Sequence, residues 1–116
     1  MKRGDIVLVD APFAGGTGRK VRPALVVQSD RYNKSFHNVV IAVITGNTKR
    51  MGDPAHLFLN PTVYPQTGLV VPSLVSFVNL HTIESSEIIK ELGTFPVSLM
   101  DDLDTCLQVA LGINKS

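Results

Sequence analysis

Short apolar runs separated by polar segments fill most of the chain, and helical periodicity follows only near its C-terminus. Runs of four to eight residues that are rich in Val, Ile and Leu and bounded by turn-forming residues are typical of strands. We predict strands at residues 6–9, 23–28, 38–45, 55–59, 73–78, 79–83 and 92–95. The runs at 73–78 and 79–83 also fit one bent strand.

Two helices are predicted in the C-terminal part of the chain. Ser85 or Ser86 is expected to cap a short helix through Lys90, because Glu87 would lie near the positive end of its dipole. Ser98 is expected to cap the main helix in the same way. Both helix starts are placed at serines because short polar side chains are favoured at the first position of a helix.

The main helix has an apolar stripe at helical spacing, formed by Leu99, Leu103, Leu107, Ala110 and Leu111. Asp101 and Asp102 suit its first turn, and Gly112 is a natural stop. Five or six short strands followed by one helix predict a mainly β fold, a small bent antiparallel barrel with the helix packed on it.

Length and composition fit one domain over residues 1–116. With 44% apolar residues in 116, the chain can bury a core. No apolar run approaches the roughly 20 residues of a membrane span, and no long apolar segment follows Met1 as in a secretory signal. The single cysteine, Cys106, excludes an internal disulfide and a multi-cysteine zinc site, so we expect a cytoplasmic protein.

The charge is unevenly distributed although the net charge is only +1. Residues 1–50 contain nine Lys and Arg against three Asp, and residues 51–116 contain two Lys against seven Asp and Glu. A basic N-terminal half favours an anionic partner such as nucleic acid, and a mixed surface that happens to segregate is the alternative.

Arg22 and Thr45 are the first candidates for chemistry. Arg22 precedes the predicted strand at residues 23–28, and Thr45 ends the next predicted strand, at residues 38–45. If the two strands are neighbours, a permanently charged guanidinium and a hydroxyl converge and can hold one phosphate. The alternative is a surface Arg and a strand-end Thr that satisfies local backbone groups.

Five segments in order make the chain resemble the MazF/PemK-like toxins of bacterial type II toxin–antitoxin pairs. They are Arg3–Asp10 (RGDIVLVD), Arg22–Asp30 (RPALVVQSD), Ile44–Thr45, His81–Glu84 (HTIE) and Asp101–Gly112. The resemblance runs nearly from end to end of the chain.

This resemblance implies an SH3-like barrel with a C-terminal helix, assembled as a homodimer and neutralised by a cognate antitoxin whose disordered tail folds over the RNA groove. It implies a metal-independent endoribonuclease without cofactors that cuts single-stranded mRNA at a preferred sequence. The substrate's 2′-hydroxyl attacks the adjacent phosphate and leaves a 2′,3′-cyclic phosphate and a 5′-hydroxyl. The family's catalytic Arg and Thr fall on Arg22 and Thr45.

The chain departs from the family where proton transfer is concerned. Thr17 replaces a loop acid, and the positions of an Arg/Asp pair that some members use hold Ser76 and Val78. His81 is one candidate for proton transfer. The alternative is cleavage that rests on Arg22, Thr45 and substrate strain alone.

Further residues are predicted to bind RNA, through phosphates, base edges or stacking. They are Phe13, Thr17, Arg19, Lys20, Asn47, Lys49 and Asn79. Arg50 is a further loop cation. His37 and His56 lack neighbours at metal-ligand spacing, so we expect both at solvent-exposed strand flanks rather than in a zinc site.

Two other functions stay open at this point. One is a non-catalytic, CcdB-like protein that poisons DNA gyrase. The other is a decayed or repurposed toxin that binds RNA or a partner without cutting it. The presence of both Arg22 and Thr45 favours the nuclease, and Thr17 and Val78 keep the last alternative open.

Overall fold

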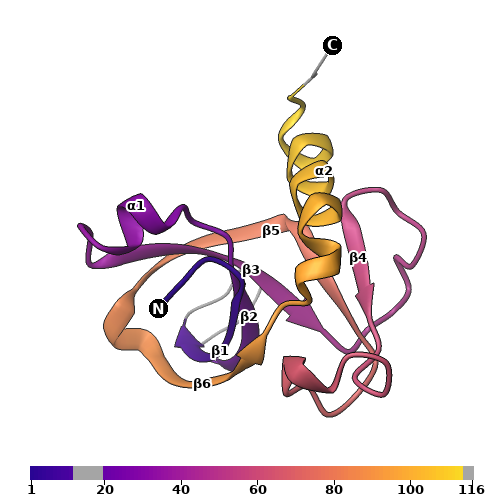
Figure 1. The fold of residues 1–116 in the computed structure, drawn as a ribbon, viewed down its shortest axis with the longest axis horizontal. Helices are drawn as coiled ribbons and strands as arrows, with labels where there is room; N and C mark the ends of the chain where they lie inside the picture. Colours follow the sequence, from indigo (N-terminus) through magenta and orange to yellow (C-terminus); the bar gives the residue numbers. More distant parts are fainter. Residues whose placement is uncertain (12–19, 114–116) are drawn as a thin grey trace.

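The structure is a computed structural model that describes residues 1–11 and 20–113. Its described part contains six strands and two α-helices (Figure 1). The strands are β1 (Asp5–Ala11), β2 (Lys20–Val26), β3 (Asn38–Thr45), β4 (His56–Leu59), β5 (Ser73–Glu84) and β6 (Ile88–Thr94). The helices are α1 (Asp30–Asn33) and α2 (Met100–Leu111).

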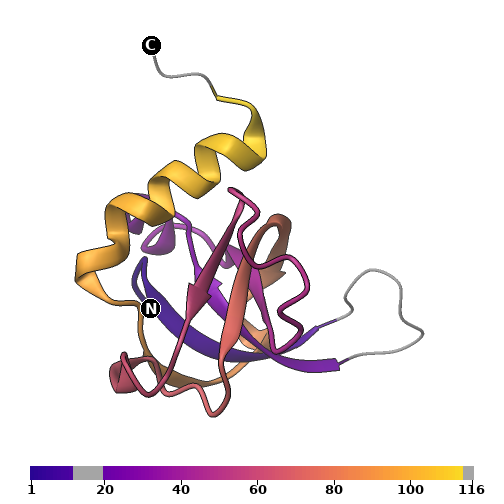
Figure 2. The same ribbon diagram turned by 90° about the vertical axis from the view of Figure 1, so that its right-hand side faces the viewer.

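All six strands belong to one antiparallel sheet in the order β4-β5-β3-β2-β1-β6. The sheet curls strongly, and α2 crosses it near β4 and β5 (Figures 1 and 2). This arrangement confirms the predicted mainly β fold with a C-terminal helix. Within the described residues, no helix is long and apolar enough to cross a membrane.

Strand β5 is continuous but bent, which confirms the single-strand alternative. Ala42 of β3 pairs with Leu80, whereas the next residue, Val43, pairs with Ser76. Residues 77–79 therefore leave the regular ladder, as in an enlarged β-bulge. Phe77 at this bend is fully buried, and Asn79 is exposed. The bend curls the sheet and turns Asn79 away from the core.

Alternating side chains of the strands build two apolar clusters on opposite faces of the sheet. One cluster contains Ile6, Leu25 and Phe77, and α2 covers it with Leu103 and Cys106. The other consists of strand residues: Val7, Val9, Ala24, Val26, Val39, Ile41, Val43 and Ile83. Because the sheet curls, both of its faces are covered by apolar partners.

The predicted short helix from Ser85 or Ser86 to Lys90 is wrong. Residues Ser85–Glu87 form one 3-10 turn, closed by a capping box between Glu84 and Glu87. From Ile88 the chain is strand β6, whose Lys90 pairs with Leu8 of β1. Pairing with the open edge of β1 satisfies the backbone of this segment and overrides its weak helical preference.

The predicted cap of the main helix at Ser98 is also wrong, because α2 begins at Met100 after a 3-10 turn at Val97–Leu99. Asp101 and Asp102 do lie in the first turn, and Gly112 ends the helix with a left-handed φ of 71°. Leu103 is buried as expected, but Leu111 in the last turn of the helix is 58% exposed.

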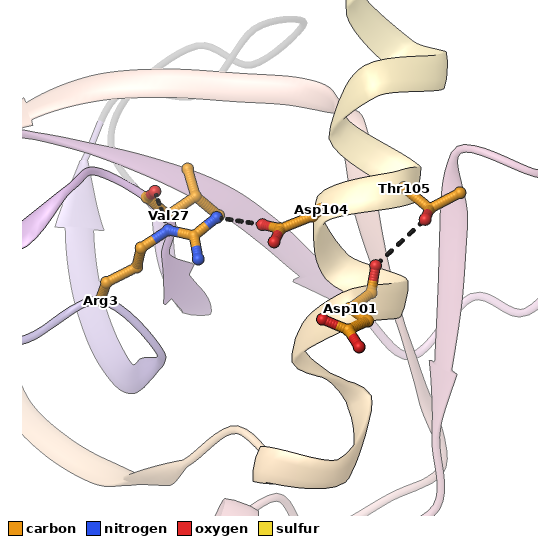
Figure 3. A network of polar contacts seen from close by, with 5 residues as sticks. All are labelled: Arg3, Val27, Asp101, Asp104 and Thr105. Atoms are coloured by element: carbon orange, nitrogen blue, oxygen red, sulfur yellow. Dashed lines mark hydrogen bonds and ion pairs between the residues drawn. The ribbon is translucent and has the colours of Figure 1, made fainter. Parts of the chain in front are cut away.

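Arg3 connects the N-terminus, the end of β2 and α2 (Figure 3). Its Nε donates to the Val27 carbonyl oxygen at 2.9 Å, and its terminal nitrogen donates to Asp104 Oδ1 at 2.7 Å. Its backbone N–H donates to Asp30 Oδ1 at 2.7 Å. Within α2, the Thr105 hydroxyl donates to the Asp101 carbonyl oxygen at 3.1 Å. Arg3 thus orients the helix on the sheet.

Substituting Gly93→Ala is expected to destabilise the fold by about 2 kcal/mol or more, as overpacking does. A Cβ at Gly93 would lie 2.6 Å from the Thr67 carbonyl oxygen, so the 3-10 turn Pro65–Thr67 would have to move away from β6. Gly46→Ala is the control, because its Cβ would meet only Val71 Cγ2 at 3.5 Å. Urea unfolding of both variants measures the difference, and equal stabilities would contradict this packing.

Candidate active site

A cavity of about 610 Å³ opens on one face of the sheet, beside the ends of β2 and β3. Strands β2, β3, β4 and β5 and the loop after β3 contribute its described walls. The polar and charged lining residues are Lys20, Arg22, Thr45, Asn47, Lys49, Arg50, His56, Ser76 and Asn79. Val43 and Leu74 line it as well. The cavity is therefore mostly polar, unlike the two apolar clusters.

Strand register brings these side chains to one face. Ala24 pairs with Val43, Val43 with Ser76, and Ser76 with His56, so one row crosses four strands. Arg22 lies two residues before Ala24, and Thr45 two residues after Val43. Because side chains in a strand repeat with a period of two, Arg22 and Thr45 face the same side as Ser76 and His56.

Arg22 lies on β2 itself, because the strand begins at Lys20 and not at the predicted residue 23. Pro23 pairs with Leu8 of β1, and the pairing of β2 with β3 begins at Ala24. The missing N–H of Pro23 therefore interrupts no bond to β3. The Arg22 side chain is half-buried, and within the described part of the chain it has no hydrogen-bond or ion-pair partner. Its guanidinium is available to an anion.

Thr45 is oriented by the loop that follows it. The Asn47 backbone N–H donates to Thr45 Oγ1 at 3.1 Å, and the Lys49 N–H donates to Asn47 Oδ1 at 3.1 Å. These two local turns order the start of the loop. Since Thr45 Oγ1 already accepts a hydrogen bond, its own hydrogen remains available as a donor.

The cavity is electropositive. Lys20, Arg22, Lys49 and Arg50 line it, and none of its described lining residues is acidic. Four cations around one concave surface attract a polyanion and hold its phosphates. The structure thus brings Lys20, Asn47, Lys49 and Asn79 to the same cavity as Arg22 and Thr45, whereas Phe13, Thr17 and Arg19 lie outside the described residues.

His81 lies outside the described cavity lining. Its Nε2 lies 2.8 Å from Oδ1 of Asn79, which does line the cavity. Because an amide oxygen only accepts, the imidazole donates this hydrogen bond. His81 therefore orients Asn79, and its proposed part in proton transfer stays a prediction.

The prediction that His56 is solvent-exposed is wrong, although His37 is exposed as expected. The His56 side chain is only 5% exposed. Its Nδ1 lies 2.7 Å from Asp53 Oδ2, and its Nε2 lies 3.0 Å from the Ser76 hydroxyl oxygen. Ser76 is also buried, at 7% exposure. The three side chains form a continuous chain of hydrogen bonds that leads to the cavity.

Two features of the sequence point to this series of hydrogen bonds, but they do not by themselves show that His56 and Ser76 meet. Asp53 and His56 are three residues apart around Pro54, and Ser76 interrupts the apolar strand residues Leu74, Val75 and Phe77. Only the pairing of β4 with β5 shows that His56 and Ser76 are opposite each other. Among the described residues, no group of three or more His, Cys, Asp or Glu side chains is placed to hold a metal ion.

Hydrogen bonds to Asp53 lower the pKa of its carboxyl group below the ordinary value of 3.8. The bond from His56 is the largest cause, and the bond from the Ala55 backbone N–H comes next, at 3.1 Å to Oδ2. Both favour the carboxylate, so Asp53 is an anion behind His56 at neutral pH.

Comparison with known proteins finds one family along almost the whole chain. The model of the PemK-like, MazF-like toxins of type II toxin–antitoxin systems matches residues 2–111. A protein of Mycobacterium bovis named endoribonuclease MazF2 is 35% identical over 115 residues, which cover 97% of this chain and 98% of the relative. Endoribonuclease MazF6 of Mycobacterium tuberculosis matches with the same values.

Solved structures have the same fold. An endoribonuclease in complex with its cognate antitoxin from a mycobacterial species superposes with a TM-score of 0.78 at 23% identity, covering 100% of this chain and 99% of that one. A MazE–MazF structure from Deinococcus radiodurans gives 0.73 at 19% identity, with 98% of each chain covered. At these identities the likeness describes the fold.

Substituting His56→Ala is expected to raise the pKa of Asp53 toward its ordinary value, because the variant loses the main hydrogen bond to the carboxylate. A carboxyl group whose pKa is lower in the folded than in the unfolded state stabilises the fold at pH values above its unfolded-state pKa. This stabilisation is lost as the pH falls through the folded-state pKa. Carboxyl ¹³C NMR titration measures the change. His37→Ala should leave the pKa of Asp53 unaltered, and an unaltered value in His56→Ala would refute the contact.

Proposed function

Because the chain belongs to the PemK-like, MazF-like toxins of type II toxin–antitoxin systems, we propose that it is an endoribonuclease that cleaves single-stranded mRNA and thereby inhibits growth. The observation that carries this proposal is the convergence of Arg22 and Thr45 on one electropositive cavity. Two relatives that match almost the whole chain are named endoribonucleases, which supports it.

The proposed reaction uses the RNA's own 2′-hydroxyl as nucleophile and needs no metal ion. A bond forms between the 2′-oxygen and the adjacent phosphorus, and the bond from phosphorus to the 5′-oxygen breaks. The products carry a 2′,3′-cyclic phosphate and a 5′-hydroxyl. Arg22 neutralises the charge that builds on the phosphate oxygens, and Thr45 donates its hydroxyl hydrogen to one of them.

The remaining polar groups of the cavity hold the RNA strand. Lys20, Lys49 and Arg50 are exposed cations that contact flanking phosphates, so binding weakens as salt increases. Asn47 and Asn79 present amide groups that can hydrogen-bond base edges, which unpaired nucleotides expose. These contacts provide selectivity for a short sequence.

The surface around the cationic cavity also suits a protein partner. A similar protein has been solved as an endoribonuclease with its cognate antitoxin. We propose that this chain also binds an antitoxin, whose disordered segment covers the cationic cavity. It acts as a homodimer in the cytoplasm, where mRNA is accessible.

Arg22→Ala and Thr45→Val are each expected to reduce RNA cleavage at least about 100-fold, since each removes one group that stabilises transition-state charge. The purified protein is incubated with single-stranded RNA and a chelator, and the new 5′ ends are mapped. Arg31→Ala removes an exposed cation on α1, outside the described cavity lining, and should retain cleavage.

Further outcomes separate this proposal from its alternatives. An RNA with a single 2′-deoxynucleotide at the mapped position should resist cleavage, because its nucleophile is missing. Uncut RNA with folded wild-type protein refutes the nuclease. In an inducible host, growth arrest with gyrase-linked DNA breaks would instead identify a gyrase poison. A folded protein that causes no arrest would be a binding protein without toxicity.

A further inference from the structure

The hydrogen-bonded chain Asp53–His56–Ser76 reaches the cavity that contains Arg22 and Thr45. Ser76 and His56 both line this cavity, and Asp53 lies behind His56. Neither Arg22, which is permanently charged, nor the Thr45 hydroxyl is suited to accept a proton at neutral pH. The proposed attack by a 2′-hydroxyl needs such an acceptor.

Hydrogen-bond chemistry determines the direction of the chain. A carboxylate only accepts, so His56 Nδ1–H donates to Asp53 Oδ2 across 2.7 Å. In the neutral imidazole this leaves the lone pair on Nε2, which accepts the Ser76 hydroxyl hydrogen across 3.0 Å. The Ser76 hydroxyl thus donates its hydrogen to His56, and its oxygen lone pairs remain available to accept a hydrogen bond from a group in the cavity.

The sheet does not require this polar pair. His56 and Ser76 are cross-strand partners on β4 and β5, and their neighbours Leu57, Val75 and Phe77 are buried apolar residues. Two apolar side chains of similar shape would stabilise such a position about as well. A buried His–Ser pair with an anion behind the histidine is instead the arrangement that polarises a hydroxyl for proton transfer.

We propose that Asp53, His56 and Ser76 form the proton relay of this active site, an inference that rests on the proposed cleavage of RNA. As the 2′-oxygen bonds to phosphorus, its proton passes to Ser76 Oγ, and the Ser76 proton passes to His56 Nε2. The leaving 5′-oxygen takes a proton from water, and the imidazolium later returns one to solvent. Ser76 contacts the substrate as a catalytic residue, and Asp53 positions and stabilises the imidazole.

Charged groups face His56 from two sides. In the cavity these are the cations Lys20, Arg22, Lys49 and Arg50. Asp53 lies on the other ring nitrogen, and Asp102 and Cys106 of α2 line a second hollow that His56 borders. The relay works only while His56 is neutral, so the reaction requires an acid limb in its pH profile.

The test measures kcat/KM for a single-stranded RNA between pH 5 and about 9. Ser76→Ala and His56→Ala should each lose about 100-fold or more at neutral pH, within the range of general-base catalysis. In His56→Ala the acid limb should disappear, and added imidazole should restore activity, because the vacated site opens to the cavity. Asp53→Asn should also lower kcat/KM, because the imidazole loses the carboxylate that positions it.

Matched variants separate the relay from a structural role. Ser76→Thr keeps a hydroxyl and should keep most of the activity, and His37→Ala should match the wild type. If His56→Ala does not fold, His56→Gln replaces it, since an amide hydrogen-bonds but does not take up a proton at neutral pH. Melting temperatures identify variants that fail to fold.

The relay is refuted if Ser76→Ala and His56→Gln both stay within about threefold of the wild type, which falls short of general-base catalysis. A loss of activity with an unchanged acid limb and no rescue by imidazole refutes it as well. In both cases, a large loss of RNA cleavage in Arg22→Ala would still support the nuclease function. Wild-type protein that does not cut RNA refutes both proposals.

Discussion

The pairing of β3 with β5, and its break at residues 77–79, is the constraint on which the active-site geometry depends. Because Val43 pairs with Ser76 and Ser76 pairs with His56, the row continues from β3 to the edge strand β4. The break lets β5 leave this row and turn Asn79 toward the cavity while Phe77 enters the core. A shift of β5 by one residue in this register would move Ser76 out of the row formed by Val43 and His56 and send the side chains of β5 to the opposite face.

The cavity separates two kinds of chemistry. Its exposed side holds cations, which attract phosphates and stabilise negative charge. Its floor holds the hydrogen-bonded Ser76–His56 pair, and the acid of these three residues, Asp53, lies behind the imidazole, away from the described lining. A carboxylate in the cavity itself would repel the RNA backbone, whereas one placed behind a histidine supports proton transfer without meeting the phosphate.

His56 contacts both the candidate active site and the region where α2 packs on the sheet. On one side it borders the cavity, and on the other it borders a hollow shared with Asp102 and Cys106 of α2. The position of α2 on the sheet depends in turn on Leu103 in the core and on Arg3, which bonds to Asp104. Packing of the C-terminal helix therefore supports the site from beneath, although α2 contributes no described residue to the cavity wall.

Periodicity and turn residues were sufficient to predict most strands, the apolar face of α2 and its stop at Gly112, because these depend on neighbours in the sequence. They also predicted Arg22 and Thr45 as candidates, because Arg22 precedes one apolar run and Thr45 follows the apolar run of the adjacent strand. The start of the last strand at Ile88, four residues before the predicted start at Leu92, needed the tertiary structure. So did the burial of His56 and its bond to Ser76. An edge strand forms only where another strand offers free backbone groups, and a hydrogen bond between residues 20 positions apart exists only once the sheet register brings them together.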